Sequence, residues 1–154
     1  MQTIEWMNKV NEIYKLINMQ KVTEIREDHE FAECIEKWGW KYHHLGVPTE
    51  EKLPDESYIS HLKIYASGFS TSPFGIEWMQ FDADCGIHPL IQKIPHLAFV
   101  VNDLDYELAN RNFTLLGKPS SPSGGVRVAM IEHNGAPIEL MEFENMKSIT
   151  LFTP

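Results

Sequence analysis

Four side chains of this 154-residue sequence combine the residue types and the spacing of a metal site: His44, Glu77, His96 and Glu139. Imidazole nitrogens together with carboxylate oxygens suit zinc and the divalent ions of the first transition row. Taken one at a time, a histidine is more often a core or surface residue than a ligand, and a strand glutamate usually faces solvent. These four stand out because they occupy matching places in two similar segments.

The sequence contains a weak internal repeat. The tetrapeptide HLGV that begins at His44 parallels HLAF at His96, and the hexapeptide IEWMQF around Glu77 parallels IELMEF around Glu139, with four identities in six. Each copy therefore consists of a strand with a histidine, an intervening stretch, and a strand with a glutamate.

The two copies differ in length. The histidine precedes the glutamate by 33 residues in the first copy and by 43 in the second. The ten extra residues match a helix that we predict over residues 103–112, capped by Asn102 or Asp103. A loop over residues 49–57 takes the place of this helix in the first copy.

Strand geometry gives the repeat a physical meaning, because side chains alternate between the two faces of a strand. His44 shares a face with Gly46, and His96 shares one with Ala98, so small neighbours leave room for a bound group. Each glutamate shares its face with a methionine and a phenylalanine. A carboxylate on an apolar face must be paired, protonated or metal-bound, because burying it bare is costly. If a pseudo-twofold axis relates the copies, the four side chains converge on one point.

The first 40 residues are predicted to form a helical extension that packs on the domain of residues 41–154. Apolar residues recur at three and four positions over residues 3–19, as in an amphipathic helix. Asp28 then resembles the N-cap of a second helix that Gly39 ends. Its inner face comprises Phe31, Ile35 and Trp38.

From residue 41 the hydrophobic period is that of strands. We predict strands over residues 41–47, 58–66, 75–81, 96–101, 113–116, 126–133 and 136–143. A turn is expected at residues 67–73, and one helical turn within residues 87–94. Asn134-Gly135 predicts a tight hairpin between the last two strands, since both residue types accept positive φ.

Composition and charge limit the function. The net charge of −9 argues against a nucleic-acid or anionic-membrane partner, because both require a basic face. Two cysteines, Cys34 and Cys85, are too few for a disulfide framework. Charged residues interrupt every apolar stretch of the N-terminus, and no window approaches the roughly 20 apolar residues of a membrane helix. We therefore expect a cytoplasmic protein without a signal peptide.

At the repeated residues the chain resembles the vicinal oxygen chelate superfamily, which includes glyoxalase, methylmalonyl-CoA epimerase, extradiol dioxygenases and the bleomycin and fosfomycin resistance proteins. The resemblance covers about residues 41–144 and rests on HLGV, HLAF and the closing NGAPIEL. It implies an α+β fold of two βαβββ-type modules, about residues 41–86 and 95–144, that form a cupped, mostly antiparallel sheet around a divalent metal. The ligands implied, as in the glyoxalase and epimerase branches, are His44, Glu77, His96 and Glu139.

This ligand set suits Zn²⁺, Ni²⁺, Co²⁺, Mn²⁺ or Fe²⁺, and the sequence does not choose among them. Four protein ligands leave two positions of an octahedral ion for a small substrate with vicinal oxygens. The ion would polarise a carbonyl and stabilise an enediolate. A carboxylate that leaves the ion could move the proton, with Glu139 our first choice and Glu77 the second. We expect a metal-dependent lyase or isomerase, and we expect the chain to pair as a homodimer, as members of the superfamily often do.

Two other functions remain open. An extradiol dioxygenase would hold iron with two histidines and one carboxylate, which would leave Glu77 idle. A non-catalytic binding protein of the resistance kind would use the same cleft without a metal. No glutathione- or CoA-binding motif is visible, so the substrate is open in every case.

The remaining histidines are alternates to the four. His43 has the opposite parity to His44, so both cannot face one cavity from a regular strand. His61 is a further alternate, and His88 is either a residue at the rim of the site or, more simply, a surface residue. His29 and His133 are expected to face solvent.

Overall fold

The computed structural model describes residues 2–19 and 30–144 of the chain. The chain divides into two compact units between Phe31 and Ala32. The first unit contains α1 (Gln2–Met19), which confirms the helix predicted over residues 3–19. No helix within the described part of the chain is long and apolar enough to cross a membrane.

The second predicted helix is shorter than expected. It is the single turn α2 (Glu33–Glu36) with Ala32 at its N-cap, whereas Asp28 lies outside the described residues. One turn is too short to present a stripe, so Phe31 and Ile35 are exposed and the predicted inner face is wrong for these two residues. Trp38 follows the helix and packs against Trp40 of the core, with ring centroids 5.0 Å apart.

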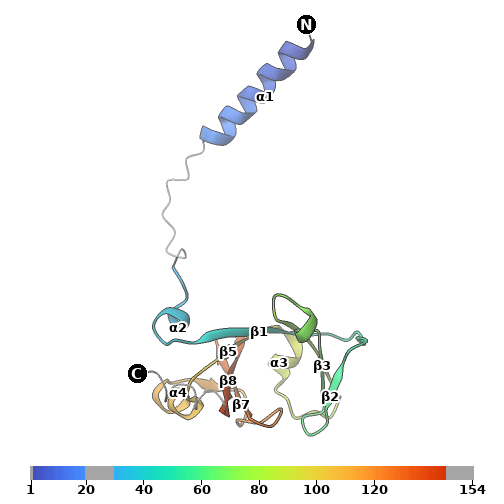
Figure 1. Ribbon diagram of the computed structural model, residues 1–154, viewed down its shortest axis with the longest axis vertical. Coiled ribbons are helices and arrows are strands. Elements are labelled where there is room, and N and C mark those ends of the chain that lie inside the picture. Colours follow the sequence, from blue (N-terminus) through green and yellow to red (C-terminus); the bar gives the residue numbers. More distant parts are fainter. Residues whose placement is uncertain (1, 20–29, 145–154) are drawn as a thin grey trace. The chain divides into compact units, whose positions relative to one another are not determined.

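The remaining residues form a single eight-stranded sheet with the strand order β2-β3-β4-β1-β5-β8-β7-β6. In Figure 1, β5, β8 and β7 form one group, β2 and β3 form another, and the long strand β1 extends past both. Two strand pairs are parallel, β1 with β4 and β5 with β8, and the other pairs are antiparallel. The strands are β1 (Lys41–Pro48), β2 (Ser57–Ile59), β3 (Ile64–Ser67), β4 (Ile76–Phe81), β5 (His96–Val100), β6 (Thr114–Leu115), β7 (Val126–His133) and β8 (Ala136–Phe143).

The strand order has two matching halves, as the repeat predicts. Read outward from the central β1–β5 pair, each half has a histidine strand, a parallel glutamate strand, and two antiparallel strands. The antiparallel register of the central pair places Leu45 opposite Leu97, and these residues hold equivalent places in the two copies. The α+β fold with a mostly antiparallel, cupped sheet is thereby confirmed.

The helical segments lie between the strands. A 3-10 turn, η2 (Phe69–Thr71), falls within the predicted turn, and α3 (Pro89–Lys93) is the predicted helical turn before β5. The helix α4 (Leu104–Asn110) occurs in the second half only, and the Asp103 side chain accepts a hydrogen bond from the Tyr106 amide at its start. The first half has a loop at this place, as the difference in copy length predicts.

One predicted strand is wrong. Residues 58–66 do not form one strand but a hairpin, in which β2 and β3 pair antiparallel around a turn. Lys63 ends this turn with a φ of 55°. Lysine is not a turn-forming residue type, and apolar residues on both sides of it give the segment the appearance of continuous strand.

The sheet separates a packed core from an open face. Phe99, Ile131 and Leu140 lie on one face with Leu104 of α4 and form the main core cluster. Ala98, Val128 and Met141 alternate with them along the same strands and therefore lie on the opposite face. His44, His96 and Glu139 share the parity of this second face, so the repeat places its histidines and glutamates away from the main core.

Candidate metal centre

The two histidines approach each other because their strands are adjacent and antiparallel. In this register Ala98 stands opposite His44, and Gly46 stands opposite His96. The two rings come to a centroid distance of 5.6 Å, nearly perpendicular at 78°. Both residues are buried, with His44 3% exposed and His96 2% exposed.

The parallel strands bring the glutamates to the same place by equivalent registers. β4 places Glu77 beside Gly46 of β1, and β8 places Glu139 beside Ala98 of β5. Both carboxylates thereby reach the centre of the sheet from opposite sides of the β1–β5 pair. The position of all four residues follows from strand pairing alone, without any loop.

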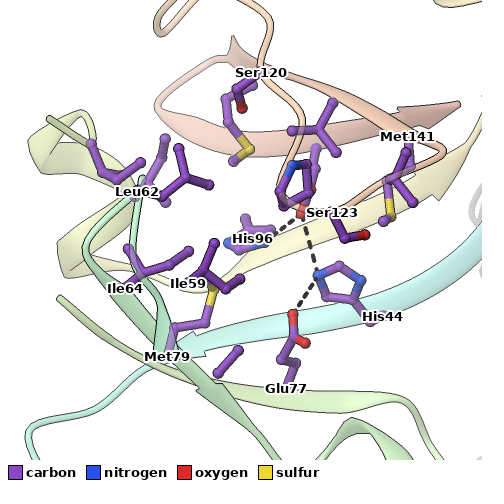
Figure 2. A pocket seen from close by; sticks show the side chains of 18 of the residues that line it. His44, Ile59, Leu62, Ile64, Glu77, Met79, His96, Ser120, Ser123 and Met141 are labelled. Carbon is purple, nitrogen blue, oxygen red and sulfur yellow. Dashed lines mark hydrogen bonds and ion pairs between the residues drawn. The ribbon is translucent and has the colours of Figure 1, made fainter. Parts of the chain in front are cut away.

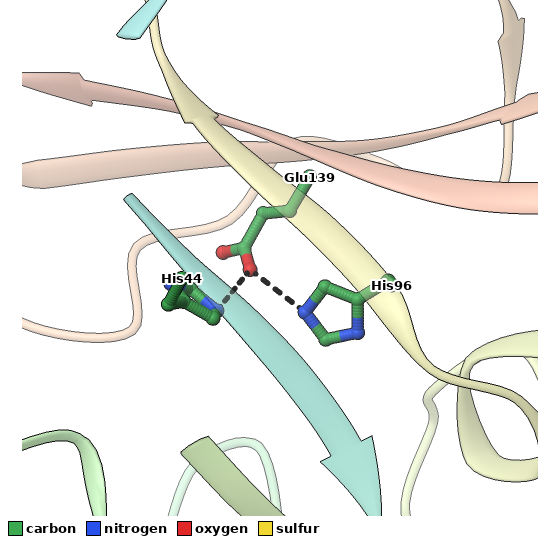
Figure 3. A group of neighbouring side chains, drawn as sticks. All are labelled: His44, His96 and Glu139. Atoms are coloured by element: carbon green, nitrogen blue, oxygen red, sulfur yellow. Dashed lines mark hydrogen bonds and ion pairs between the residues drawn. The ribbon is translucent and has the colours of Figure 1, made fainter. Parts of the chain in front are cut away.

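Three of the four side chains form a tight group. One Glu139 oxygen, Oε2, lies 3.3 Å from His44 Nε2 and 3.2 Å from His96 Nε2. One ligand atom of each of the three residues lies within 4.8 Å of the other two. Figure 3 shows both rings turned toward the carboxylate that lies between them.

Glu77 lies at the edge of this group. Its Oε2 is 3.4 Å from His44 Nε2, but its carboxylate is not part of the mutual three-residue cluster. Its side chain is 25% exposed, against 12% for Glu139. The structure therefore brings all four predicted residues together but distinguishes one glutamate from the other.

The group fits a divalent cation. His44 Nε2 is buried and has no hydrogen-bond partner among the described residues, although it faces two carboxylates at ion-pair distance. An unsatisfied buried nitrogen is costly unless something binds it. Two imidazole nitrogens and a carboxylate oxygen directed at one point could hold a zinc or first-row transition metal ion.

The two glutamates differ in their electrostatics. Burial alone would raise the pKa of Glu139, but its contacts with His44 and His96 lower that pKa to about 2. Burial also raises the pKa of Glu77, and there the histidine contacts do not reverse the effect. For His44, burial lowers the pKa, but the Glu139 carboxylate outweighs burial and the net shift is upward. The two imidazoles thus favour the ionised form of Glu139, whereas burial favours the protonated form of Glu77.

His43 also faces the site, contrary to the expectation for a regular strand. The register of β1 against β5 shifts between Tyr42 and His44, so β1 carries a β-bulge at His43. The bulge turns His43 to the same side as His44, and their Nδ1 atoms are 2.8 Å apart. The His43 ring stacks on Phe69 at 4.8 Å with an angle of 5° between the planes. No residue type in this segment signals a bulge, so sequence reasoning missed this arrangement.

The three other described histidines lie outside the site. His61 Nε2 contacts the Ser121 carbonyl oxygen at 2.8 Å. His88 caps α3, where its Nδ1 accepts a hydrogen bond from the Leu90 amide. His133 is exposed beside the hairpin turn, as predicted. His29 lies outside the described residues.

Gly46, the small residue beside His44, serves a purpose other than the one expected. A Cβ atom at Gly46 would lie less than 3.0 Å from three ring atoms of His96. The space beside Gly46 is therefore filled by the histidine of the neighbouring strand and is not left for a bound group. Glycine at this position is what allows His96 to lie flat across β1.

A cavity of about 350 Å³ opens on the side of the sheet that carries the four residues. Figure 2 shows Ile59, Leu62 and Ile64 beside His96, on the side away from His44. The polar side chains that line the cavity are His43, His44, Glu77, His96, Ser120, Ser123 and Glu139. The candidate ligands thus lie in the wall of a cavity large enough for a small molecule.

Comparison with known proteins finds solved structures with a similar fold but no match by sequence. No protein-family model matches the chain, and no curated protein matches it either. The fold is similar to the crystal structure of hypothetical protein BH1468 from Bacillus halodurans C-125, at 17% identity and a TM-score of 0.53, over 68% of this chain and 94% of that one. Methylmalonyl-CoA epimerase from Mycobacterium tuberculosis aligns at 19% identity and a TM-score of 0.46, over 66% of this chain and 87% of that one, which is too loose to bear on activity. The first likeness shows the fold alone.

Proposed function

We propose that the chain is a metal-dependent isomerase or lyase of the glyoxalase-like kind, acting on a small substrate with oxygens on adjacent carbons. The observation that carries the proposal is the group of His44, His96 and Glu139, whose ligand atoms converge in the wall of a cavity. The buried His44 Nε2, which has no hydrogen-bond partner in the described part of the chain, supports a cation at this point.

In this proposal His44, His96 and Glu139 would hold the ion, and Glu77 would be a fourth ligand that can leave. Glu139 Oε2 contacts both histidines, so its displacement would break two interactions. Among the described residues, Glu77 forms an ion-pair contact with His44 but not with His96, and it is the more exposed of the two glutamates. A divalent ion held here supplies Lewis acidity for a carbonyl and its neighbouring oxygen.

Geometry therefore favours Glu77 over Glu139 as the base, the reverse of the order that sequence alone suggested. The Glu77 carboxylate accepts the proton from the carbon next to the carbonyl. The electron pair of the broken C–H bond forms a carbon–carbon double bond, and the π pair of the carbonyl moves onto its oxygen to give the enediolate. Return of the proton to the other face or to the neighbouring atom gives the isomer. No oxidant or reductant is needed, and the raised pKa of Glu77 suits both steps.

An extradiol dioxygenase is the second candidate, because one observation favours it. The mutual cluster contains two histidines and one carboxylate, which is the ligand set of non-haem iron oxygenases. In that case Glu77 has no role as a ligand. Oxygen consumption with a catechol by the iron-loaded protein, unchanged in the Glu77→Gln variant, would favour this candidate over the isomerase.

The proposal is tested by metal content and by solvent proton exchange. Purified protein should carry about one divalent ion per chain, and His96→Ala should lose most of it, because water does not replace an imidazole at equal strength. Glu77→Gln should keep the ion but lose exchange of the α-hydrogen of small α-hydroxy ketones for deuterium, followed by NMR. Glu139→Gln should lose much of the ion itself. A protein that binds no divalent ion above the level of His96→Ala would refute the metal-dependent enzyme.

A further inference from the structure

We propose that the part of the substrate beyond its vicinal oxygens is a small, uncharged hydrocarbon group, and that the β2–β3 hairpin provides the surface that recognises it. The position of the oxygens rests on the proposed function. The apolar character of the remaining wall follows from the residues that line the cavity, and it can be tested without a metal.

The wall away from the ligands is apolar. Ile59 and Ile64 come from β2 and β3, and Leu62 comes from the turn between these strands. The three lie together on the side of His96 away from His44, so a ligand that reaches past His96 meets hydrocarbon (Figure 2). Met79 and Ile91 add further apolar surface from β4 and α3.

The charges in the cavity exclude an anionic remainder. Among the described residues no lysine or arginine lines it, and its carboxylates are Glu77 and Glu139. Two carboxylates balance one divalent cation, so no charged side chain within this cavity remains to neutralise a further phosphate or carboxylate. Burying an unpaired anion in apolar surroundings costs several kcal/mol or more. A neutral hydrocarbon meets no such penalty and gains free energy from each apolar contact.

The volume limits the size of this group. About 350 Å³ is at the small end of ligand cavities, which typically range over roughly 300–1,000 Å³. The metal-chelating oxygens and a chain or ring of a few carbons fill such a space. A nucleotide-sized group together with the chelating oxygens exceeds this volume.

The first experiment uses the full-length, metal-free protein with its methionine methyl groups labelled with ¹³C. Met79, Met130 and Met141 line the cavity, whereas Met7 lies on α1 and serves as the internal reference. Titration with 1-hexanol should shift the three cavity methyl signals and leave Met7 unchanged. Sodium hexanoate at the same concentrations should shift none of them. Equal shifts with both compounds, or none with hexanol, would overturn the proposal.

Substitution identifies the wall. Leu62→Ser should weaken hexanol binding by at least about threefold, since a partly buried apolar contact is removed. Leu115→Ser is the matched control, because Leu115 is 47% exposed and does not line the cavity. Ile59→Ser provides an independent second test should Leu62→Ser fail to fold. Unchanged hexanol affinity in the folded variants would contradict the assigned wall.

The second experiment separates this inference from the metal proposal. Alkyl hydroxamates present vicinal oxygens to a bound ion, and their affinity for the zinc-loaded protein should rise about fourfold per added methylene until the cavity is filled. A hydroxamate of equal length that ends in a carboxylate should gain nothing. If hexanol binds but no zinc does, the metal-dependent enzyme is wrong and the apolar cavity stands. If zinc and acetohydroxamate bind but longer chains bind no better, the hydrocarbon-binding wall is wrong and the metal site stands.

Discussion

Replacing Gly46 by alanine tests the packing on which the metal centre depends. The added Cβ would lie less than 3.0 Å from three ring atoms of His96, a separation that real structures essentially never show. The His96 side chain is 1% exposed and lines the cavity, so the ring must shift away from β1, and the cavity offers the space for that shift. Gly46 does not have a positive φ, so the backbone tolerates alanine and the effect is purely one of overlap.

The direction of the stability change distinguishes steric overlap with His96 from the ordinary strand preference of alanine over glycine. Alanine within a strand is normally about 0.5–1 kcal/mol more favourable than glycine. Overpacking a buried site costs about 1–3 kcal/mol. We therefore expect a net cost of up to about 2.5 kcal/mol for Gly46→Ala, which lowers the Tm by up to about 10 °C at roughly 2–4 °C per kcal/mol for a chain of this size. Zinc affinity should fall at least about tenfold, because a displaced ligand costs no less than a lost outer-shell partner.

The assay is a double-mutant cycle, with thermal unfolding followed by circular dichroism and zinc affinity by competition with a chromophoric chelator. In the His96→Ala background the ring is absent, so Gly46→Ala should be neutral or slightly stabilising. Gly124→Ala is the control, since its Cβ would meet nothing within 4 Å. If Gly46→Ala unfolds and binds zinc like the parent protein, the close approach of His96 to β1 is wrong.

Three further predictions concern the metal centre and the strands that support it. His43→Phe keeps a ring to stack on Phe69 but removes the nitrogen that lies 2.8 Å from His44 Nδ1. Zinc affinity, measured by isothermal titration calorimetry, should therefore fall about 10–100-fold. The control variant His88→Ala should leave zinc affinity unchanged. Zinc affinity should also decrease as the pH is lowered through the pKa of His44, which is raised above about 6.5, because protons compete with zinc for the imidazole. Glu139, with a pKa of about 2, stays ionised over the same range. Zinc affinity that is constant from about pH 8 to pH 5 would contradict this order of protonation. Gly135→Ala should lower the free energy of unfolding, measured with urea, by about 1–2 kcal/mol, because Gly135 has a φ of 83° in the β7–β8 turn. Gly117 has open space around it and no positive φ, so Gly117→Ala should lower this free energy far less.

The sequence predicted those parts of the fold that have a local chemical signal. β7 and β8 begin and end at the predicted residues, because Asn134-Gly135 specifies the turn and alternation specifies the strands. The histidine and glutamate strands were found through the repeat, which relates distant segments without knowledge of the pairing. The equivalent pairing registers of β1 with β4 and of β5 with β8 then follow from the twofold relation between the two copies.

What the sequence could not predict depends on contacts without such a signal. The β-bulge at His43 arises from the pairing of β1 with β5, and the positive φ of Lys63 divides a segment that resembles one strand. The difference between Glu77 and Glu139 depends on which carboxylate reaches both imidazoles, which periodicity does not determine. The short α2 shows the same limit, since Phe31 before it and Ile35 within it follow the helical period but remain exposed.

The central β1–β5 register has a consequence for how such a site can change over time. A twofold axis through the Leu45–Leu97 pair exchanges His44 with His96, so a symmetric dimer of identical half-length chains could supply the same ligands. In such a dimer every substitution in the cavity wall would occur twice. In one continuous chain the halves vary independently, and here one carries the β2–β3 hairpin in the wall while the other carries Ser120 and Ser123. Selection can therefore alter what the cavity accepts through one half without disturbing the ligands that both halves share.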